Sequence, residues 1–273
     1  MNHIFDKFQL EHRTAIVTGG AGLLGRQFCR TLAQAGANVI IADLFEEAAK
    51  KLETSLKDEG LNATACQVNV TDETSVAEMV SFTLKTYGSV DVLVSSAAMD
   101  PKFDDSQQGQ HTNNFEDYPV DAFRDALDVN LTGMFLCARE AVKPMLAQQR
   151  GSIINICSTY GLVGPDQRLY EREGKPQQFK PVFYSVTKSG VVGFTKYLAA
   201  YYAGKNIRVN ALTPGGVYNN HDEEFTQKYS SRTVMGRMAD QDEMNGAVLY
   251  LASDASSYMT GSNLVVDGGW TAW

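Results

Sequence analysis

Short apolar runs alternate along the chain with longer segments in which apolar residues recur at helical spacing. The runs have the length of buried strands and cover residues 14–18, 38–42, 63–68, 90–95, 152–157, 208–212 and 263–266. The segments between them predict helices over 25–35, 46–59, 73–87, 120–148, 182–203 and 241–253. Apolar strands alternating with amphipathic helices are typical of βαβ units. The pattern predicts an α/β fold with a doubly wound, parallel, seven-stranded sheet and helices on both faces.

The length of 273 residues suits one large domain, and no repeat or low-complexity tract divides it, so we expect a single domain over 1–273. Three connections are longer than such units need, at 99–119, 164–181 and 215–238, and the third contains a short helical stretch. All three follow predicted strands. They should therefore project from the carboxyl edge of the sheet, where open α/β folds bind ligands.

Composition narrows the class of protein. The net charge of -8 disfavours nucleic acid as a partner, because phosphates require Lys or Arg for neutralisation. No apolar run is long enough to span a bilayer, and the first residues lack the pattern of a secretory signal. The four cysteines and four histidines are widely dispersed, which predicts neither disulfides nor a metal site. We expect a cytoplasmic protein that binds no metal, membrane or nucleic acid.

A glycine-rich turn follows the first predicted strand, with Gly19, Gly22 and Gly25 at its key positions. Glycine allows a tight turn and a close approach of the backbone to a pyrophosphate, and the helix that begins there offers N–H groups to an anion. The position between a strand and a helix favours dinucleotide binding over a purely structural turn.

Asp43 ends the second predicted strand, at a suitable distance from the glycine-rich turn. A carboxylate at this place can accept hydrogen bonds from the ribose hydroxyls of the adenosine and repels a 2′-phosphate. The next residue is Leu44 rather than a basic one, and Gly22 occupies a position where a basic residue would help to hold NADP. We therefore expect NAD as the cofactor. The alternative is that Asp43 only caps the following helix.

Tyr184 and Lys188 are four residues apart at the start of a long predicted helix, which puts them on one face. A phenol is a poor base at neutral pH, but a neighbouring ammonium lowers its pKa towards a useful range. Upstream, Ser158 follows the fifth predicted strand and could donate a hydrogen bond to a substrate oxygen. A solvated helix face and a turn residue are the alternative interpretations of these positions.

Asn130 is an unusual residue for the interior of the predicted helix 120–148, because Asn is a poor helix former. It could hold a water molecule or distort the helix beside the site, or make a polar contact in the core. In the connection 164–181, Arg168 or Arg172 could pair with a carboxylate or phosphate of the substrate, or simply be solvated. The polarity of this connection suits a substrate with many hydrogen-bonding groups.

These motifs together resemble the short-chain dehydrogenase/reductase family from about Arg13 to Gly269. The resemblance implies a Rossmann fold, a catalytic set of Asn130, Ser158, Tyr184 and Lys188, and frequent assembly as a homotetramer or dimer. The residues that it implies at the cofactor are Gly19, Gly22, Leu24, Gly25, Asp43, Asn69, Val70, Ser96, Ala97, Tyr184, Lys188, Pro214, Gly215 and Val217.

The chain departs from the family pattern at three places. Leu23 stands where shorter members have glycine or alanine, and Ser95-Ser96-Ala97-Ala98 replaces Asn-Asn-Ala-Gly after the fourth strand. Ser158 and Tyr184 are 26 positions apart, about twice the common spacing, because 164–181 is inserted between them.

The sequence predicts an NAD(H)-dependent oxidoreductase that interconverts a secondary alcohol and a ketone on a polar, polyhydroxylated small molecule. A sugar, a sugar acid or a precursor of a surface glycan would suit the polar insertion. A 3-ketoacyl-thioester reductase is one alternative, although it would usually use NADPH and a basic patch for the carrier protein. A dinucleotide-binding scaffold or sensor without catalysis is another.

Overall fold

A computed structural model describes residues 3–100 and 113–273 of the chain. Its centre is one parallel seven-stranded sheet with the order β3-β2-β1-β4-β5-β6-β7. The strands are β1 (Thr14–Thr18), β2 (Asn38–Asp43), β3 (Ala63–Gln67), β4 (Val92–Ser95), β5 (Gly151–Ile156), β6 (Ile207–Pro214) and β7 (Asn263–Val266). The predicted fold class, a doubly wound Rossmann sheet, is confirmed.

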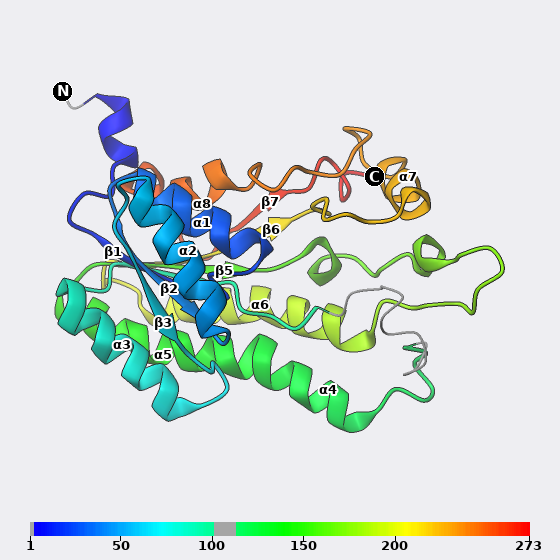
Figure 1. Ribbon diagram of the computed structural model, residues 1–273, viewed down its shortest axis with the longest axis horizontal. Coiled ribbons are helices and arrows are strands. Elements are labelled where there is room, and N and C mark those ends of the chain that lie inside the picture. The colour runs from blue at the N-terminus through cyan, green and yellow to red at the C-terminus, as the bar shows by residue number, and fades with distance from the viewer. Residues whose placement is uncertain (1–2, 101–112) are drawn as a thin grey trace.

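Helices cover both faces of the sheet (Figure 1). One face carries α1 (Leu23–Gln34), α2 (Glu46–Asp58) and α8 (Asn245–Ala252), and the other carries α3 (Glu73–Tyr87), α4 (Val120–Leu127), α5 (Gly133–Ala147) and α6 (Val182–Tyr201). Beyond the carboxyl edge lies α7 (Glu223–Ser230), at the right of Figure 1. The short helical turns are η1 (Ile4–Phe8), η4 (Thr159–Gly161), η5 (Gln167–Tyr170) and η6 (Asp254–Ser256).

Each central strand contributes side chains to two hydrophobic cores, one on each face of the sheet. In β1, Ala15 and Val17 pack into the core beneath α1 and α8, whereas Ile16 packs into the core beneath α3 and α5. In β2, Ile41 joins the first core and Ile40 the second. Because successive strand side chains point to opposite faces, a strand buried on both sides must be apolar at every position. This requirement produced the continuous apolar runs of the sequence.

The strand order reverses beside β1, which has β2 on one side and β4 on the other. The connections that follow these neighbouring strands lead to opposite faces of the sheet and leave a crevice at the carboxyl edge, where such folds bind ligands. The long connections at 164–181 and 215–238 extend beyond this edge (Figure 1). Of the predicted loop 99–119, residues 101–112 lie outside the described part of the chain.

The prediction of one continuous helix over 120–148 is wrong, because the helix is interrupted. A π-helical turn, η3 (Asp128–Thr132), separates α4 from α5 and contains Asn130. The predicted helix over 241–253 is also shorter in the structure, since α8 begins at Asn245. A π turn inserts an extra residue into the helical repeat and occurs frequently at functional sites. The distortion expected from Asn130 is therefore present.

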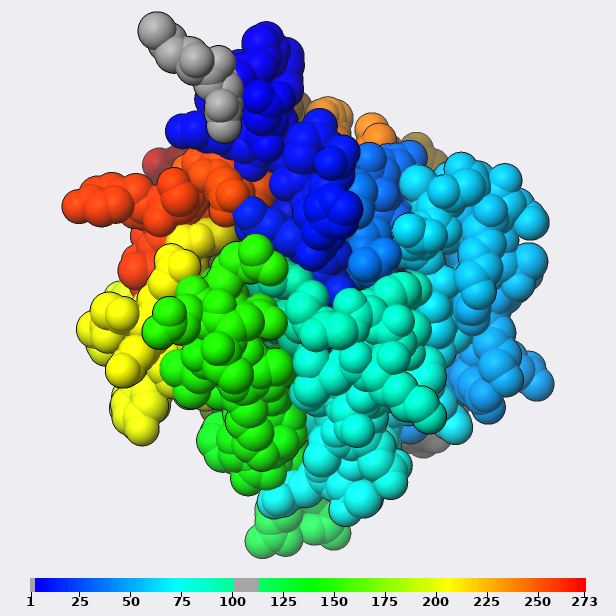
Figure 2. Space-filling model, turned by 90° about the vertical axis from the view of Figure 1, so that its left-hand side faces the viewer, coloured from blue at the N-terminus to red at the C-terminus, as the bar shows by residue number. Residues whose placement is uncertain are grey.

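The opposite, amino edge of the sheet is held by a polar network around Asp91 (Figure 2 views this end of the molecule). The Asp91 carboxylate, with a side chain only 1% exposed, accepts hydrogen bonds from the Thr14 N–H at 2.9 Å and the Ser89 hydroxyl at 2.7 Å. The Arg150 guanidinium donates to it through two nitrogens at 2.8 and 2.5 Å. The network ties β1, β4 and β5 together where these strands begin.

Within residues 3–100 and 113–273, no helix is both long and apolar enough to cross a membrane. In the same residues, no group of three or more His, Cys, Asp or Glu side chains is placed to hold a metal ion.

Candidate active site

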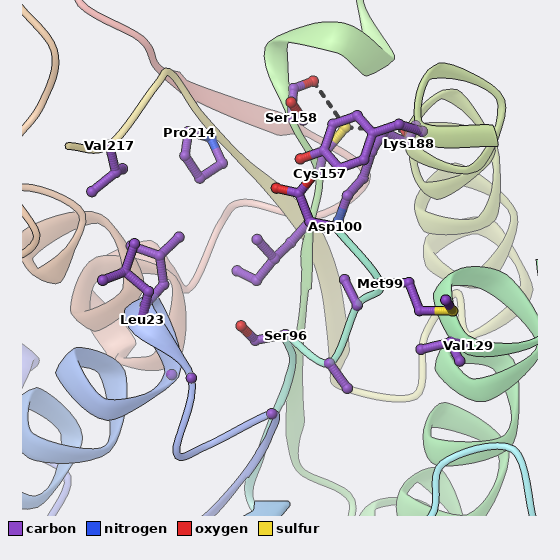
Figure 3. A pocket seen from close by; sticks show the side chains of 18 of the residues that line it. Leu23, Ser96, Met99, Asp100, Val129, Cys157, Ser158, Lys188, Pro214 and Val217 are labelled. Atoms are coloured by element: carbon purple, nitrogen blue, oxygen red, sulfur yellow. Dashed lines mark hydrogen bonds between the residues drawn. The ribbon is translucent and has the colours of Figure 1, made fainter. Parts of the chain in front are cut away.

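A cavity of about 710 Å³ opens at the carboxyl edge of the sheet, beside the reversal of strand order. It is lined by the last residues of β2, β5 and β6 and by the connections that follow β1, β2, β4, β5 and β6. All the residues predicted to contact the cofactor line it, and so does Ser158. Figure 3 shows Ser158, Asp100 and Lys188 together at one end of the pocket, away from Leu23 and Ser96.

The glycine-rich turn forms one wall of the cavity. Gly19 has a φ of +62°, and a Cβ added to it would lie 2.8 Å from the Cα of Ala97. A Cβ on Gly25 would lie 2.0 Å from the carbonyl oxygen of Gly19. Only glycine fits at these two positions, because the turn is tight and α1 begins directly after it. The turn and the N-terminal end of α1 form a cradle that suits a pyrophosphate.

The segment Ser95-Ser96-Ala97-Ala98 is held against this turn although it departs from the family pattern. The Thr18 hydroxyl accepts hydrogen bonds from the backbone N–H groups of Ser96 at 3.1 Å and Ala97 at 3.3 Å. Ser96, Ala97 and Ala98 line the cavity with small side chains. The replacement therefore keeps the backbone close to the glycine-rich turn, and Thr18 is a positioning residue to which sequence analysis gave no role.

Asp43 lies at the end of β2 and lines the cavity, as expected. Its carboxylate accepts hydrogen bonds from the N–H groups of Ala21, at 2.9 Å, and Phe45, at 3.0 Å, so it also fixes the turn. The lining residues that follow it are Leu44, Phe45 and Ala48, none of them basic. The lysines in the described lining, Lys180 and Lys188, are both close to the ring of Tyr184 instead.

Tyr184, in the first turn of α6, is partly buried at the end of the cavity away from the glycine-rich turn. Burial raises the pKa of its phenol well above the ordinary value, and the charge of Asp100 raises it further. A hydrogen bond with Ser158 lowers this pKa and so opposes part of the shift. The structure thus joins two of the predicted catalytic residues, and the insertion between them does not keep them apart.

Lys188 lies one helical turn after Tyr184, with its Nζ 5.8 Å from the centroid of the tyrosine ring. The ammonium donates a hydrogen bond to the carbonyl oxygen of Ile156 at 3.0 Å, and burial lowers the pKa of the amine. Burial is the largest cause of the pKa shift of both Tyr184 and Lys188 in the protein without ligands. That Lys188 lowers the Tyr184 pKa stays a prediction.

Asn130 is buried in the π turn and does not line the cavity. Its side-chain oxygen accepts the Met99 N–H at 2.7 Å, and its amide donates to the Met99 carbonyl oxygen and to Thr187, each at 3.2 Å. Because Met99 lines the cavity, Asn130 acts in this structure as a clamp on that wall. The structure therefore favours a polar contact in the core, one of the alternative interpretations of Asn130, over direct contact with a ligand.

The two predicted substrate cations of the insertion do not reach the cavity. The Arg168 side chain is 72% exposed and pairs with Asp166, at 2.8 Å. Arg172 pairs with Asp222 at 2.8 Å and donates to the carbonyl oxygens of Leu169 and Glu171. Both guanidinium groups stabilise the loop itself. The insertion contributes Tyr170 and Lys180 to the lining instead.

The wall around Tyr184 is more aromatic than the polar insertion suggested. Tyr160, Leu169, Tyr170, Tyr229, Met238 and Trp270 form one buried cluster, against which Tyr184 and Phe225 pack. Tyr229 stacks on Trp270 at 4.2 Å between ring centroids. Sequence reasoning missed this wall, although Tyr170 and Tyr229 come from the connections 164–181 and 215–238, which were predicted to project over the site. Tyr160 and Trp270 come from the residues after β5 and β7. The signal was the aromatic content of those connections.

His221 also lines the cavity and was not predicted. Its Nδ1 accepts a hydrogen bond from the Asn219 N–H at 3.2 Å, and its ring stacks on Phe225 at 5.0 Å between centroids. Burial lowers the pKa of the imidazole, which favours its neutral form. With Nδ1 accepting, Nε2 carries the proton and can donate to a ligand.

Comparison with known proteins gives a consistent result across the chain. Residues 20–271 match a family model described as enoyl-(acyl carrier protein) reductase. The chain is 35% identical, over 265 residues, to cis-4-hydroxycyclohexanecarboxylate dehydrogenase of Sinomonas cyclohexanicum, covering 95% of this chain and 97% of that protein.

Two solved structures are similar over almost the whole chain. A short-chain type dehydrogenase/reductase from Mycobacterium marinum has a TM-score of 0.86 at 30% identity and covers 100% of both chains. A gluconate 5-dehydrogenase from Burkholderia cenocepacia J2315, solved in complex with NADP and tartrate, has a TM-score of 0.87 at 30% identity. That similarity covers 99% of this chain and 100% of the other.

Proposed function

Because the chain belongs to the short-chain dehydrogenase/reductase family, whose members similar to it act on CH–OH groups, we propose that it interconverts a secondary alcohol and a ketone with NAD(H). One observation carries the proposal. Tyr184, Ser158 and Lys188 meet at one end of a cavity whose other wall is the glycine-rich turn. A group for proton transfer and a cradle for a dinucleotide thus share one space.

The residues present fit a dinucleotide. The turn Gly19–Gly25 would hold its pyrophosphate, Asp43 the adenosine ribose, and Asn69 and Val70 would flank the adenine. Lys188 would bind the ribose of the nicotinamide, and Pro214, Gly215 and Val217 would contact the carboxamide. When bound, the oxidised cofactor supplies the acceptor for a hydride from the alcohol carbon.

NAD is the proposed cofactor rather than NADP. The carboxylate of Asp43 would repel a 2′-phosphate, and Leu44, Phe45 and Ala48 offer it no cation. The related gluconate 5-dehydrogenase was solved with NADP, so the choice depends on these residues and not on the fold.

Tyr184 is the proposed general base of oxidation and general acid of reduction. Its phenolate would take the proton of the substrate hydroxyl, while the Ser158 hydroxyl donates a hydrogen bond to the same oxygen. Since burial raises the Tyr184 pKa in the protein alone, oxidation should be favoured by alkaline pH. Asn130 would support this site by fixing Met99 rather than by touching the substrate.

The proposed substrate is a small, polar, hydroxylated molecule of the kind represented by sugar acids and cyclic hydroxy acids. Two similar proteins are named as dehydrogenases of hydroxycyclohexanecarboxylate and gluconate. The mixture of an aromatic wall with His221 and Lys180 can contact both a carbon ring and its polar groups. A long acyl chain or a steroid would gain little from these two polar side chains.

A panel assay tests this function. The purified protein is given NAD⁺ or NADP⁺ with cis- and trans-4-hydroxycyclohexanecarboxylate, gluconate and related polyols, and in reverse an acetoacetyl thioester with NADH or NADPH. We expect turnover of at least one hydroxy acid, with kcat/KM higher for NAD⁺ than for NADP⁺. A preference for the thioester with NADPH would instead support a 3-ketoacyl-thioester reductase.

A scaffold or sensor without catalysis is the second candidate, since the segment Ser95–Ala98 departs from the family pattern. Binding of NADH without turnover of any substrate in the panel would favour it.

We also propose that the protein acts in the cytoplasm as a homotetramer or dimer. Tyr197 and Tyr201 on α6 are 62% and 65% exposed, and Phe135 on α5 is also exposed, which leaves aromatic surface for a second copy to cover. Light scattering of the purified protein measures the oligomeric state.

A further inference from the structure

Lys180 is the residue that the inserted connection sends into the substrate end of the cavity. Its Nζ lies 4.0 Å from the centroid of the Tyr184 ring, and its side chain is only 10% exposed. The backbone of Lys180 is fixed by Gln167, which accepts its N–H at 2.8 Å and donates to its carbonyl oxygen at 3.3 Å. The insertion thus holds an ammonium group against the ring of the proposed proton-transfer residue.

Asp100 provides a carboxylate for this ammonium, with 2.5 Å between Nζ and Oδ1. The two partners differ in exposure, because the Asp100 side chain is 52% exposed while the lysine is almost buried. Asp100 also points into the same end of the pocket as Ser158 (Figure 3). A carboxylate therefore already occupies the position next to the proposed catalytic tyrosine, on a side chain that can move into solvent.

We propose that Lys180 binds a carboxylate group of the substrate, which replaces Asp100 in the ion pair. This inference rests on the proposed function and specifies its substrate as a hydroxy acid. Removing the partner of a buried cation is costly, whereas exchanging one carboxylate for another keeps the ammonium paired. An exposed carboxylate loses little when it returns to water. A neutral alcohol would leave the Lys180–Asp100 pair intact and would gain no binding free energy from Lys180.

The surroundings support an anion at this place. Tyr170, Tyr184 and Phe225 belong to one aromatic cluster in the wall of the cavity, and the Lys180 ammonium lies against the ring of Tyr184. Apolar walls weaken the competition of water for a buried ion pair. They also suit the carbon skeleton between the hydroxyl at Tyr184 and the acid group at Lys180.

A binding experiment on the complex with NADH tests the proposal without any turnover. Calorimetry measures the Kd of cyclohexanecarboxylate and of its neutral analogue cyclohexanecarboxamide. We expect the wild type to bind the acid at least about tenfold more tightly than the amide, and K180M to lose this preference. K175M is the matched control, because Lys175 is an exposed lysine of the same insertion that does not line the cavity.

D100N provides a second variant with the opposite expected sign. It removes the Asp100 carboxylate, which competes with the substrate, while leaving Lys180 in place, so the acid should bind more tightly than to the wild type. An unchanged or weaker affinity of D100N for the acid would overturn the exchange. Equal loss of acid and amide binding in K180M would overturn it too, because it would indicate a structural role for the lysine.

Steady-state kinetics separates this proposal from the proposed function. In K180M, kcat/KM should fall at least about tenfold more for 4-hydroxycyclohexanecarboxylate than for 4-methylcyclohexanol. If neutral and acidic alcohols were affected alike, with a shifted pH profile, Lys180 would act on the Tyr184 pKa and carboxylate recognition would be refuted while the oxidoreductase stands. If the wild type oxidised no alcohol with NAD⁺, the proposed function itself would fail.

Discussion

Asp91 at the amino edge of the sheet and Lys188 at the carboxyl edge are both buried charged residues, but their surroundings differ. Asp91 accepts hydrogen bonds from the chain on several sides, including two from Arg150. Lys188 lines the cavity, its ammonium donates a hydrogen bond to the carbonyl oxygen of Ile156 at 3.0 Å, and burial lowers its pKa. The fold thus gives the Asp91 carboxylate several hydrogen-bond donors, whereas the Lys188 ammonium is left with capacity to bind a ligand.

This difference separates stability from function. A buried charge that the chain itself pairs and hydrogen-bonds contributes to folding, whereas one held ready for a ligand costs stability until the ligand arrives. Substitutions at the two edges should therefore affect different measurements.

The largest effect is expected from Lys188→Met, which keeps the length of the side chain and removes its charge. We expect kcat/KM to fall about 10²- to 10⁴-fold, because the ammonium that stabilises the phenolate and binds the ribose is lost. The unfolding midpoint in urea should stay the same or rise, since the methionine needs no hydrogen bond. A variant that kept its activity, or that unfolded much more easily, would break the comparison.

Asp91→Ala should show the reverse behaviour. Thr14 N–H and the Ser89 hydroxyl lose a buried acceptor and Arg150 loses its partner, so we expect a loss of about 3 kcal/mol in the free energy of unfolding. Arg150 is half exposed, which keeps the loss from being larger. Urea denaturation measures it, and kcat/KM of the folded protein should change less than about twofold. A large kinetic defect without destabilisation would contradict the structural role.

Asp43→Asn tests a residue that combines both roles. The N–H groups of Ala21 and Phe45 donate to different oxygens of the carboxylate, and the amide keeps only one of these acceptors. The turn should therefore be weakened by the loss of one hydrogen bond, about 1 kcal/mol, but stay folded. Losing the negative charge should shift the ratio of kcat/KM for NAD⁺ and NADP⁺ about tenfold towards NADP⁺, or about 1.4 kcal/mol. An unchanged ratio would mean that Asp43 serves only the turn.

The smallest effect is expected from Arg168→Gln. This cation lies in the insertion but outside the cavity, and its side chain is exposed although that of its partner Asp166 is not. Exposed pairs contribute about 0–1 kcal/mol, so stability and the KM for an acidic substrate should both change little. A several-fold rise in that KM would restore Arg168 as a substrate ligand, as its position in the sequence had suggested.

Sequence alone predicted the sheet well because its strands are buried on both faces. The strands 14–18 and 263–266 and the helix 73–87 have the predicted bounds, since apolar runs, the cap at Asp72 and Gly88 determine their ends. The helix over 120–148 was harder. Its apolar spacing continues through the π turn, and only Asn130 indicated a distortion.

The residues of the site could be predicted only where a tight turn or the helical spacing determines which residue types fit. Glycines 19 and 25 are required by contacts of the turn, and Tyr184 and Lys188 by helical spacing, so the pattern identified them. Arg168, Arg172 and Lys180 are equivalent cations in the sequence. Which of them enters the cavity depends on how Gln167, Asp166 and Asp222 pair with the loop, and those contacts arise only in three dimensions.

The central claim is that Tyr184 transfers the proton at a site where a dinucleotide binds. Tyr184→Phe removes one oxygen and keeps the ring, so NADH should bind with an unchanged Kd while single-turnover oxidation becomes about 10²- to 10⁴-fold slower. Since the Tyr184 pKa is raised by burial, wild-type oxidation should speed up as the pH rises, and the variant should lose this dependence. Normal oxidation by Tyr184→Phe with the same pH profile would contradict the account.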